Sequence, residues 1–202
     1  MNEPSGRRKR LIIGISGASG AIYGVRLLQI LRRLDVETHL IMSRAALLTL
    51  ALETDFRRAD VEALAAVVHT NSDIGAACAS GSFGTLGMIV APCSVKTLSE
   101  IATGVTPSLI SRAADVTLKE RRRLVLMLRE TPLHLGHIRS MALATEAGAI
   151  LYPPVPGFYA KPASLEAMID HTLGRMLSLF DIDAGLVDEW PGSRGAARDE
   201  DG

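Results

Sequence analysis

Short apolar runs alternate with amphipathic segments along the chain. Runs with the length of buried strands lie at Leu11–Ile15, Val36–Met42, Gly87–Ala91, Leu124–Leu128 and Ala149–Leu151. Segments whose apolar residues recur at helical spacing lie between them, at Ala21–Leu34, Arg44–Leu52, Val61–Ala66, Val95–Thr103, Ser108–Leu118 and His134–Ala147. A last helix is predicted over Ser164–Phe180, after a proline-rich connector at 153–159.

This alternation predicts the fold class. The strands are apolar on both faces, as in parallel sheets that are covered by helices on both sides. We therefore expect a three-layer α/β fold, Rossmann-like or flavodoxin-like, with a mostly parallel central sheet. Ligands of such sheets bind at the carboxyl ends of the strands, so functional residues are expected directly after each strand.

Composition fixes the domain organisation. The 202 residues, 48% hydrophobic and 22% charged, suffice for one globular domain with a sizeable core. We assign residues 11–190 to this domain. Residues 1–10, which include the basic run Arg7–Arg10, and residues 191–202 are expected to be disordered tails.

Charge and cysteine content disfavour several functional classes. With 22 basic and 22 acidic residues the net charge is zero, whereas nucleic-acid binders are usually basic. No apolar run approaches the ~20 residues that a membrane helix needs, and no secretory signal is expected. Cys78 and Cys93 give neither a disulfide framework nor a Cys-x-x-Cys site. We expect a cytoplasmic protein that binds neither nucleic acid nor membranes.

A glycine turn follows the first predicted strand. In LIIGISGASGAIYG, Gly14, Gly17 and Gly20 separate the strand from a helix, an order that places backbone N–H groups and a helix N-terminus where a phosphate can bind. The spacing fits neither the G-x-G-x-x-G dinucleotide motif nor a P-loop. The second strand ends at Ser43 rather than at the acidic residue of an NAD site, and a serine can bind a phosphate or a flavin ring.

Polar residues also follow the later strands, each with a structural alternative. Ser94 and Thr97 come after the third apolar run, where capping of a helix is the alternative role. Arg129 and Glu130 follow a buried strand directly, with a solvated loop as the alternative. The basic cluster Lys119–Arg123 could be ordinary helix-surface charge.

Taken together, these segments resemble one family. The chain contains, in order, GISGASGAIYGVRLL, ALETD, ASGSFGTLGMIVAPCSVKTLSEIATG, SLISRAADVTLKERRRLVLMLRETPLH and GAILYPPVPGFYAKP. Over residues 11–190 it resembles the flavin prenyltransferases of the UbiX type. The resemblance implies an enzyme that joins a dimethylallyl group from dimethylallyl phosphate to N5 and C6 of reduced FMN. The prenylated FMN would serve a UbiD-type decarboxylase.

The resemblance also implies site residues. Those expected to bind FMN are Gly17, Ala18, Ser19, Ser43, Ser94, Val95, Lys96, Thr97 and Arg129. Those expected to bind dimethylallyl phosphate are Lys119, Arg129, Tyr159 and Arg175. Those expected at the reacting centre are Ser19, Glu53, Glu130 and Trp190. Members of the family form homo-oligomers, typically dodecamers, with active sites at subunit interfaces.

These residue types suit the chemistry of prenyl transfer. Lys119, Arg129 and Arg175 can neutralise the charge that develops on the leaving phosphate, and Tyr159 can donate to it. Glu130 or the released phosphate could remove the ring proton. The aromatic faces of Trp190 and Tyr159 can stabilise an allylic cation. Because fixed cations do this work, no metal is expected.

Some departures and alternatives remain open. Ser16 and Ser108 stand where the family commonly has Thr and Asn. His134 and His137 have a spacing that could suit a metal, with a structural role as the alternative. A cysteine-decarboxylating flavoprotein is a rival, although its PASANT-type segment and catalytic His are lacking. A non-catalytic FMN-binding accessory subunit of a decarboxylase is the second. The sequence leaves open which decarboxylase uses the product, and whether the prenyl donor is dimethylallyl monophosphate or diphosphate.

Overall fold

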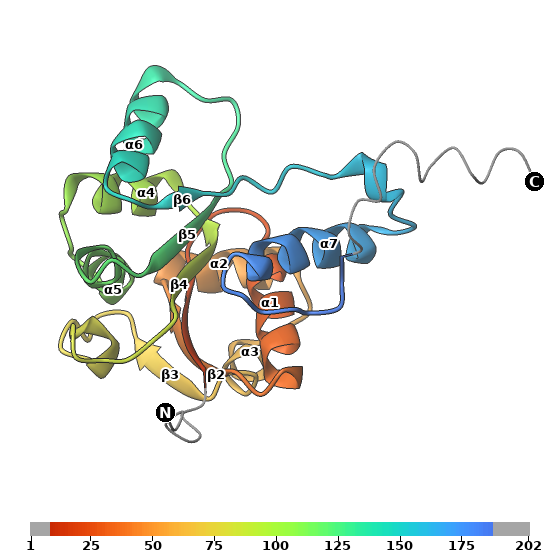
Figure 1. The fold of residues 1–202 in the computed structure, drawn as a ribbon, viewed down its shortest axis with the longest axis horizontal. Helices are drawn as coiled ribbons and strands as arrows, with labels where there is room; N and C mark the ends of the chain where they lie inside the picture. The colour runs from red at the N-terminus through yellow and green to blue at the C-terminus, as the bar shows by residue number, and fades with distance from the viewer. Residues whose placement is uncertain (1–8, 188–202) are drawn as a thin grey trace, which may run out of the picture.

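A single parallel sheet organises the chain, as the computed structural model of residues 9–187 shows (Figure 1). Its 6 strands pair in the order β3-β2-β1-β4-β5-β6 and all pairs are parallel. The strands are β1 (Arg10–Ile15), β2 (Glu37–Met42), β3 (Val67–Thr70), β4 (Gly87–Cys93), β5 (Arg123–Leu128) and β6 (Ile150–Leu151). This is the strand order of the Rossmann fold, so the expected α/β class is confirmed.

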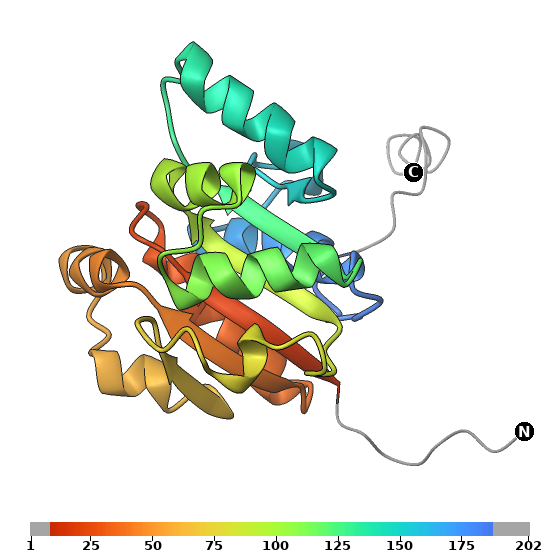
Figure 2. The ribbon, with the colours of Figure 1, turned by 90° about the vertical axis from the view of Figure 1, so that its left-hand side faces the viewer.

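Helices cover both faces of the sheet, which gives three layers (Figure 2). The helices are α1 (Ala21–Arg33), α2 (Arg44–Glu53), α3 (Arg58–Glu62), α4 (Val95–Thr103), α5 (Leu109–Lys119), α6 (Leu135–Glu146) and α7 (Leu165–Ser178), with short 3-10 turns η1 (Ala77–Ala79) and η2 (Phe158–Ala160). Helices α1 and α7 pack together on one face, and α4 packs with α5 and α6 on the other. None of the helices in this part of the chain is long and apolar enough to cross a membrane.

The alternation of β1 side chains builds the two cores. Leu11, Ile13 and Ile15 belong to the core under α1 and α7, whereas Ile12 belongs to the core under α4 and α5. All four side chains are at most 2% exposed. A strand buried on both faces has no polar positions, which is why the sequence shows continuous apolar runs.

The edge of the sheet departs from the sequence prediction. Strand β3 was not predicted. It is a four-residue strand at the edge of the sheet, and its two valines, Val67 and Val68, are 37% and 41% exposed, so it lacks the apolar pattern of a buried strand. The helix predicted over 61–66 instead runs from Arg58 to Glu62, where Asp60 accepts a hydrogen bond from the Arg57 N–H at 2.9 Å. That capping contact starts the helix earlier than the apolar spacing indicates.

The N-terminal boundary also differs from the expectation. Arg10, which was assigned to the tail, begins β1 and contacts Glu37 of the neighbouring strand, with 2.8 Å between Nε and Oε1. Residues 1–8 and 188–202, which include Trp190 and the tail expected at 191–202, lie outside the described residues.

An ion pair holds α7 on α1. The guanidinium of Arg26 donates to both carboxylate oxygens of Asp170, at 2.6 and 2.7 Å. This hydrogen bonding, together with the positive charge of Arg26, holds the pKa of Asp170 below its ordinary value, against the opposing effect of burial. Because α7 carries Arg175, the ion pair also helps to place a candidate site residue.

We expect Asp170→Asn to lower the free energy of unfolding by about 1–3 kcal/mol at pH 7, because the charge-assisted hydrogen bonds are lost. The folded-state pKa of Asp170 lies below the unfolded value of about 3.9, so its stabilisation is present above that pH and is lost as the pH falls below it. Urea unfolding of both proteins at pH 7 and pH 3 should show the difference shrinking in acid.

Asp181→Asn is the control for this prediction. Asp181 also pairs with an arginine, Arg123, at 2.8 Å, but its side chain is 83% exposed, so we expect a loss below about 1 kcal/mol. A difference between wild type and Asp170→Asn that stays constant from pH 7 to pH 3 would show that the charge of Asp170 is not responsible.

Candidate functional site

The connections after β1 and β4 leave the sheet toward opposite faces. The chain after β1 enters α1 on one face, and the chain after β4 enters α4 on the other. Such a divergence opens a crevice at the carboxyl ends of the two neighbouring strands. A cavity of about 380 Å³ lies there. It brings together the predicted residues Gly17, Ser43, Ser94, Lys96 and Thr97.

Three helix N-termini border this cavity, those of α2, α4 and α5. Ser43 caps α2 by accepting a hydrogen bond from the Ala46 N–H at 3.0 Å, and Ser94 caps α4 by accepting one from the Thr97 N–H at 3.3 Å. The capping role considered for Ser94 from the sequence is therefore confirmed, Ser43 has the same role at α2, and both serines line the cavity as well. Helix N-termini attract anions, so this part of the crevice suits a phosphorylated ligand.

The glycine turn is required by close packing. A Cβ at Gly17 would lie 2.3 Å from the Cβ of Ala45, so the turn can approach α2 only without a side chain. Gly20 has φ of 94° at the N-cap of α1, a backbone conformation that favours glycine. The turn is thus held against the start of α2, directly beside the cavity.

The N-terminus of α1 is occupied by a carboxylate of the chain itself. Glu53 accepts hydrogen bonds from the N–H groups of Gly20 and Ala21, at 2.7 and 3.1 Å. Two N–H groups of the helix end at which the sequence predicts a phosphate are therefore used by Glu53. Among the helix ends that border the cavity, those of α2 and α4 are better placed for a phosphate.

Glu53 belongs to a small polar cluster. Burial opposes its ionisation, but hydrogen bonds from Ser19, Gly20 and Ala21 and the positive charge of Arg129 outweigh burial and hold its pKa below the ordinary value. The backbone N–H of Arg129 donates to the carbonyl of Cys93 at 3.1 Å, which ties the end of β5 to the end of β4. Ser19, Glu53 and Arg129, all predicted from the sequence, therefore lie in one region as an ionised carboxylate with a nearby cation.

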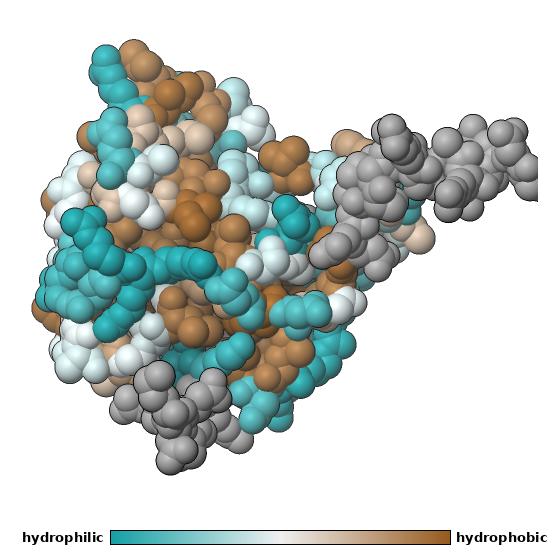
Figure 3. Space-filling view, in the orientation of Figure 1, coloured by the Kyte–Doolittle hydropathy of each residue, from teal (hydrophilic) through white to brown (hydrophobic). Residues whose placement is uncertain are grey.

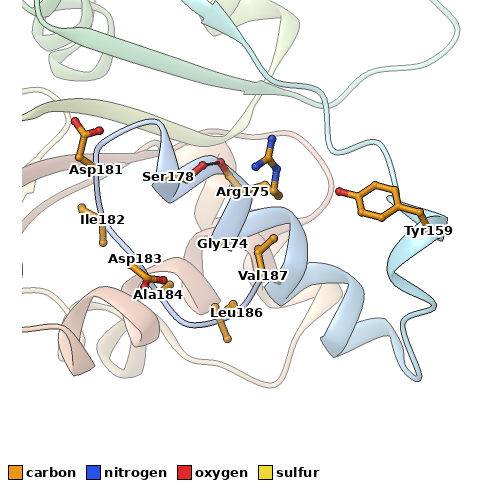
Figure 4. A pocket seen from close by; sticks show the side chains of 10 residues that line it. All are labelled: Tyr159, Gly174, Arg175, Ser178, Asp181, Ile182, Asp183, Ala184, Leu186 and Val187. Atoms are coloured by element: carbon orange, nitrogen blue, oxygen red, sulfur yellow. Dashed lines mark hydrogen bonds between the residues drawn. The ribbon is translucent and has the colours of Figure 1, made fainter. Parts of the chain in front are cut away.

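A second, larger cavity contains two predicted substrate-binding residues. Tyr159 of η2 and Arg175 of α7 line a space of about 620 Å³ together with the segment that follows α7. In Figure 4 the hydroxyl of Tyr159 is turned toward the side of the cavity where the guanidinium of Arg175 lies. The ring of Tyr159 packs edge-on against His171, with 5.5 Å between ring centroids. A phenol and a guanidinium around one space suit a phosphate group.

Lys119 does not lie with the other predicted residues. It ends α5, whereas Ser108, the N-cap of the same helix, lines the 380 Å³ cavity. At 1.5 Å per residue, the 11 residues of α5 separate its ends by about 16 Å. Lys119 pairs with Glu120 close to the start of β5, at the amino ends of the strands and opposite to the cavity. Within one chain Lys119 lines neither this cavity nor the one at Tyr159 and Arg175.

The remaining predicted residues have simpler surroundings. Glu130 is exposed, and its carboxylate accepts a hydrogen bond from the Thr131 N–H at 3.0 Å. Val95 opens α4, and Ala18 is 7% exposed within the glycine turn. His134 caps α6 through the Gly136 N–H at 3.0 Å, and its ring lies 3.6 Å from that of His137, so His134 has the structural role that was the alternative to metal binding.

The cavity also contains residues that sequence reasoning did not assign to it. Its lining is completed by Arg44, Ala45, Leu48, Asn71, Glu100, Ser108 and Ile110. Asn71 follows β3 directly. Its backbone carbonyl accepts a hydrogen bond from the Leu109 N–H at 2.8 Å, and its side-chain Oδ1 accepts one from the Ile110 N–H at 3.2 Å, both at the start of α5. A polar residue after a strand was the right signal for Asn71, but that strand itself was not predicted.

Fold and site together define an α/β protein that binds a phosphorylated ligand at the switch point of a Rossmann-type sheet. Residues 2–189 match the family described as Flavoprotein. The flavin prenyltransferase UbiX of Escherichia coli strain K12 is 59% identical over 188 residues, which cover 92% of this chain and 100% of the relative. The chain therefore belongs to the UbiX flavin prenyltransferase family, within the flavoproteins.

Solved structures agree with this assignment. A crystal structure of AnUbiX in complex with FMN and dimethylallyl pyrophosphate is similar with a TM-score of 0.90 and 53% identity, over 92% of this chain and 99% of the other. A dodecameric FMN-dependent UbiX-like decarboxylase from Escherichia coli O157:H7 has a TM-score of 0.88 and 45% identity, over 91% of this chain and 100% of the other.

We expect Gly17→Ala to lower the free energy of unfolding by about 1–3 kcal/mol, because the added methyl group overpacks the contact with Ala45. Gly75→Ala is the matched control, since the atom nearest to its added Cβ would be Asp73 Oδ1 at 3.6 Å, an ordinary contact. Urea unfolding would test both. Equal stability of the two variants would mean that the turn is not held against α2.

Proposed function

We propose that this chain is a flavin prenyltransferase, which joins the dimethylallyl group of dimethylallyl phosphate to N5 and C6 of reduced FMN. The observation that carries the proposal is the gathering of residues from distant segments around two cavities. Gly17, Ser43 and Ser94 meet at one, and Tyr159 and Arg175 at the other. These are positions to which the resemblance assigns FMN and the prenyl phosphate.

The crevice between β1 and β4 has features that fit FMN. It has a volume of about 380 Å³, serine hydroxyls, and the N-termini of α2 and α4 for a phosphate. The close packing of Gly17 on Ala45 leaves no room for a side chain at this point of the cavity wall. Reduced FMN would supply the two nucleophilic ring positions that accept the prenyl group.

The chain's own residues would bind and activate the prenyl phosphate. Arg175 and Tyr159 would hold the phosphate and stabilise the charge that grows on it as the allylic bond breaks. Arg129, kept near the ionised Glu53, would add a second cation at the turn. Closure onto C6 would use the prenyl double bond, which gains one proton while C6 loses one. Glu130 or the departing phosphate would take the proton from C6, a general-base role, and the same acid–base pair can return a proton to the prenyl carbon.

We propose further that complete sites form between subunits of a homo-oligomer, as a dodecamer. The position of Lys119 supports this, because it lies about 16 Å along α5 from the cavity at Ser108 and lines neither cavity of its own chain, so another copy would supply this cation. Large apolar side chains are also exposed on α2 and α6, including Leu48 at 62%, Leu52 at 86% and Leu135 at 60%. Figure 3 shows hydrophobic surface over α6. Contacts between copies would remove these side chains from water.

The product would pass to a UbiD-type decarboxylase as its cofactor. Two buried, unpaired cysteines, Cys78 and Cys93, support our proposal that the enzyme works in a reducing compartment, the cytoplasm. The accessory-subunit alternative shares the FMN site but makes no use of the cations that would bind a prenyl phosphate. The two functions therefore differ in one measurable respect, the fate of dimethylallyl phosphate.

Anaerobic incubation with reduced FMN and dimethylallyl phosphate should yield a flavin heavier than FMN by one C5H8 unit in a mass spectrum. We expect Arg175→Ala to lower kcat/KM for dimethylallyl phosphate about a hundredfold, because a preorganised cation is lost. Arg57→Ala is the control, since the Arg57 side chain is 83% exposed and pairs locally with Asp60 of the adjoining helix. Unchanged FMN, with diphosphate tried as well, would leave the accessory subunit as the function.

A mixing experiment tests the shared site. Lys119→Ala and Arg175→Ala homo-oligomers should each be nearly inactive. If a site takes these two residues from different subunits, dissociation and reassembly of a mixture produces some sites with both residues intact. We expect activity to reappear in the mixture and not in either variant reassembled alone. A mixture that stays as inactive as its parents would place both residues in the same subunit's site.

A further inference from the structure

Ser16 links the two loops of the crevice through three hydrogen bonds. Its hydroxyl donates to the Pro92 carbonyl at 2.9 Å and accepts from the Ser94 N–H at 2.7 Å. Its own N–H donates to the same Pro92 carbonyl at 3.1 Å. The residue is 1% exposed, so it is buried beneath the crevice and does not line the cavity.

These hydrogen bonds connect the chain beyond the point where the regular pairing of β1 with β4 ends. The register between β1 and β4 runs from Ile12 opposite Met88 to Gly14 opposite Val90, and the pairing of β4 with β5 is irregular between Val90 and Cys93. The loop that follows therefore lacks a regular ladder on the β1 side. Ser16 supplies both a donor and an acceptor there, and a single hydroxyl meets both needs.

The position of α4 depends on this link. Ser94 is the N-cap of α4, so fixing its N–H also fixes the direction in which the first turn of α4 points. Ser16 directly precedes Gly17, the closest-packed residue of the glycine turn. One buried side chain thus sets the distance between the glycine turn and the α4 N-terminus, the two walls of the crevice.

We propose that Ser16 is a positioning residue for flavin binding, which holds the two FMN-binding loops at the separation the ligand needs. This inference rests on the proposed function, because the ligand is taken to be FMN. Ser16 acts through Ser94 and Gly17 and does not touch the ligand. Removal of its hydroxyl leaves the Ser94 N–H without its partner, and the loop is then free to shift.

Three substitutions separate the hydroxyl from the volume of the side chain. Ser16→Ala removes the hydroxyl, Ser16→Thr keeps it, and Ser16→Val matches threonine in size but cannot donate or accept. We expect the dissociation constant for FMN to rise about ten- to hundredfold in the Ala and Val variants. The Thr variant should stay within about threefold of wild type. Fluorescence titration of FMN with the full chain measures this.

Thr117→Val controls for general destabilisation. The hydroxyl of Thr117 is also buried, at 1% exposure, and donates to the Ala113 carbonyl at 2.7 Å inside α5, away from the crevice. It should lower the melting temperature but leave FMN affinity unchanged. The positioning role is overturned if Ser16→Ala binds FMN like wild type, if Ser16→Thr fails along with Ser16→Val, or if Thr117→Val weakens binding equally.

Amide hydrogen exchange in the ligand-free protein provides a second readout. Peptides that contain Ser94 should exchange faster in Ser16→Ala than in wild type, and Ser16→Thr should restore protection. Unchanged exchange would overturn the link. A wild type that binds FMN but makes no prenylated product would refute the transferase and still allow the Ser16 test. A wild type that binds no FMN would refute the proposed function and leave exchange to decide whether Ser16 holds the loop.

Discussion

The divergence of the chain after β1 and β4 is the constraint on which the site depends. When the connections of two adjacent parallel strands leave toward opposite faces, the hydrogen-bond ladder between the strands ends early. Backbone donors are then left at the carboxyl ends of the two strands. The chain provides hydrogen-bond acceptors for some of these donors and leaves others facing the cavity. Glu53 uses those at the start of α1, Ser16 uses that of Ser94, and the helix ends of α2 and α4 face the cavity.

The charge distribution of the crevice follows from this arrangement. A negative carboxylate at the N-terminus of α1 is favourable, and it also keeps a counter-charge near Arg129. Glu53 uses two donors of that helix end, the glycine turn contributes a close-packed wall of the cavity, and the N-termini of α2 and α4 also border it.

Some parts of the molecule could be predicted because local physics decides them. Buried strands read as apolar runs whatever surrounds them, so β1, β2, β4 and β5 were found within about two residues. Strand β3 was missed, since a short, half-exposed edge strand has no such pattern, and with it went the signal for Asn71. The N-terminus of α3 was missed because a side-chain contact of Asp60, rather than apolar spacing, sets it.

The sequence by itself determined the fold class, the crevice at the strand ends and the family, because strand periodicity and long motifs are local properties of the chain. It also identified Gly17, Ser43, Ser94, Glu53, Tyr159 and Arg175 as candidates. Only the tertiary structure decided how they group. Contacts between segments 30 to 80 residues apart set whether Glu53 occupies a helix end and whether Ser16 reaches Ser94. The length of α5 takes Lys119 away from the cavity that Ser108 lines. Such contacts depend on where the helices pack, which no local pattern specifies.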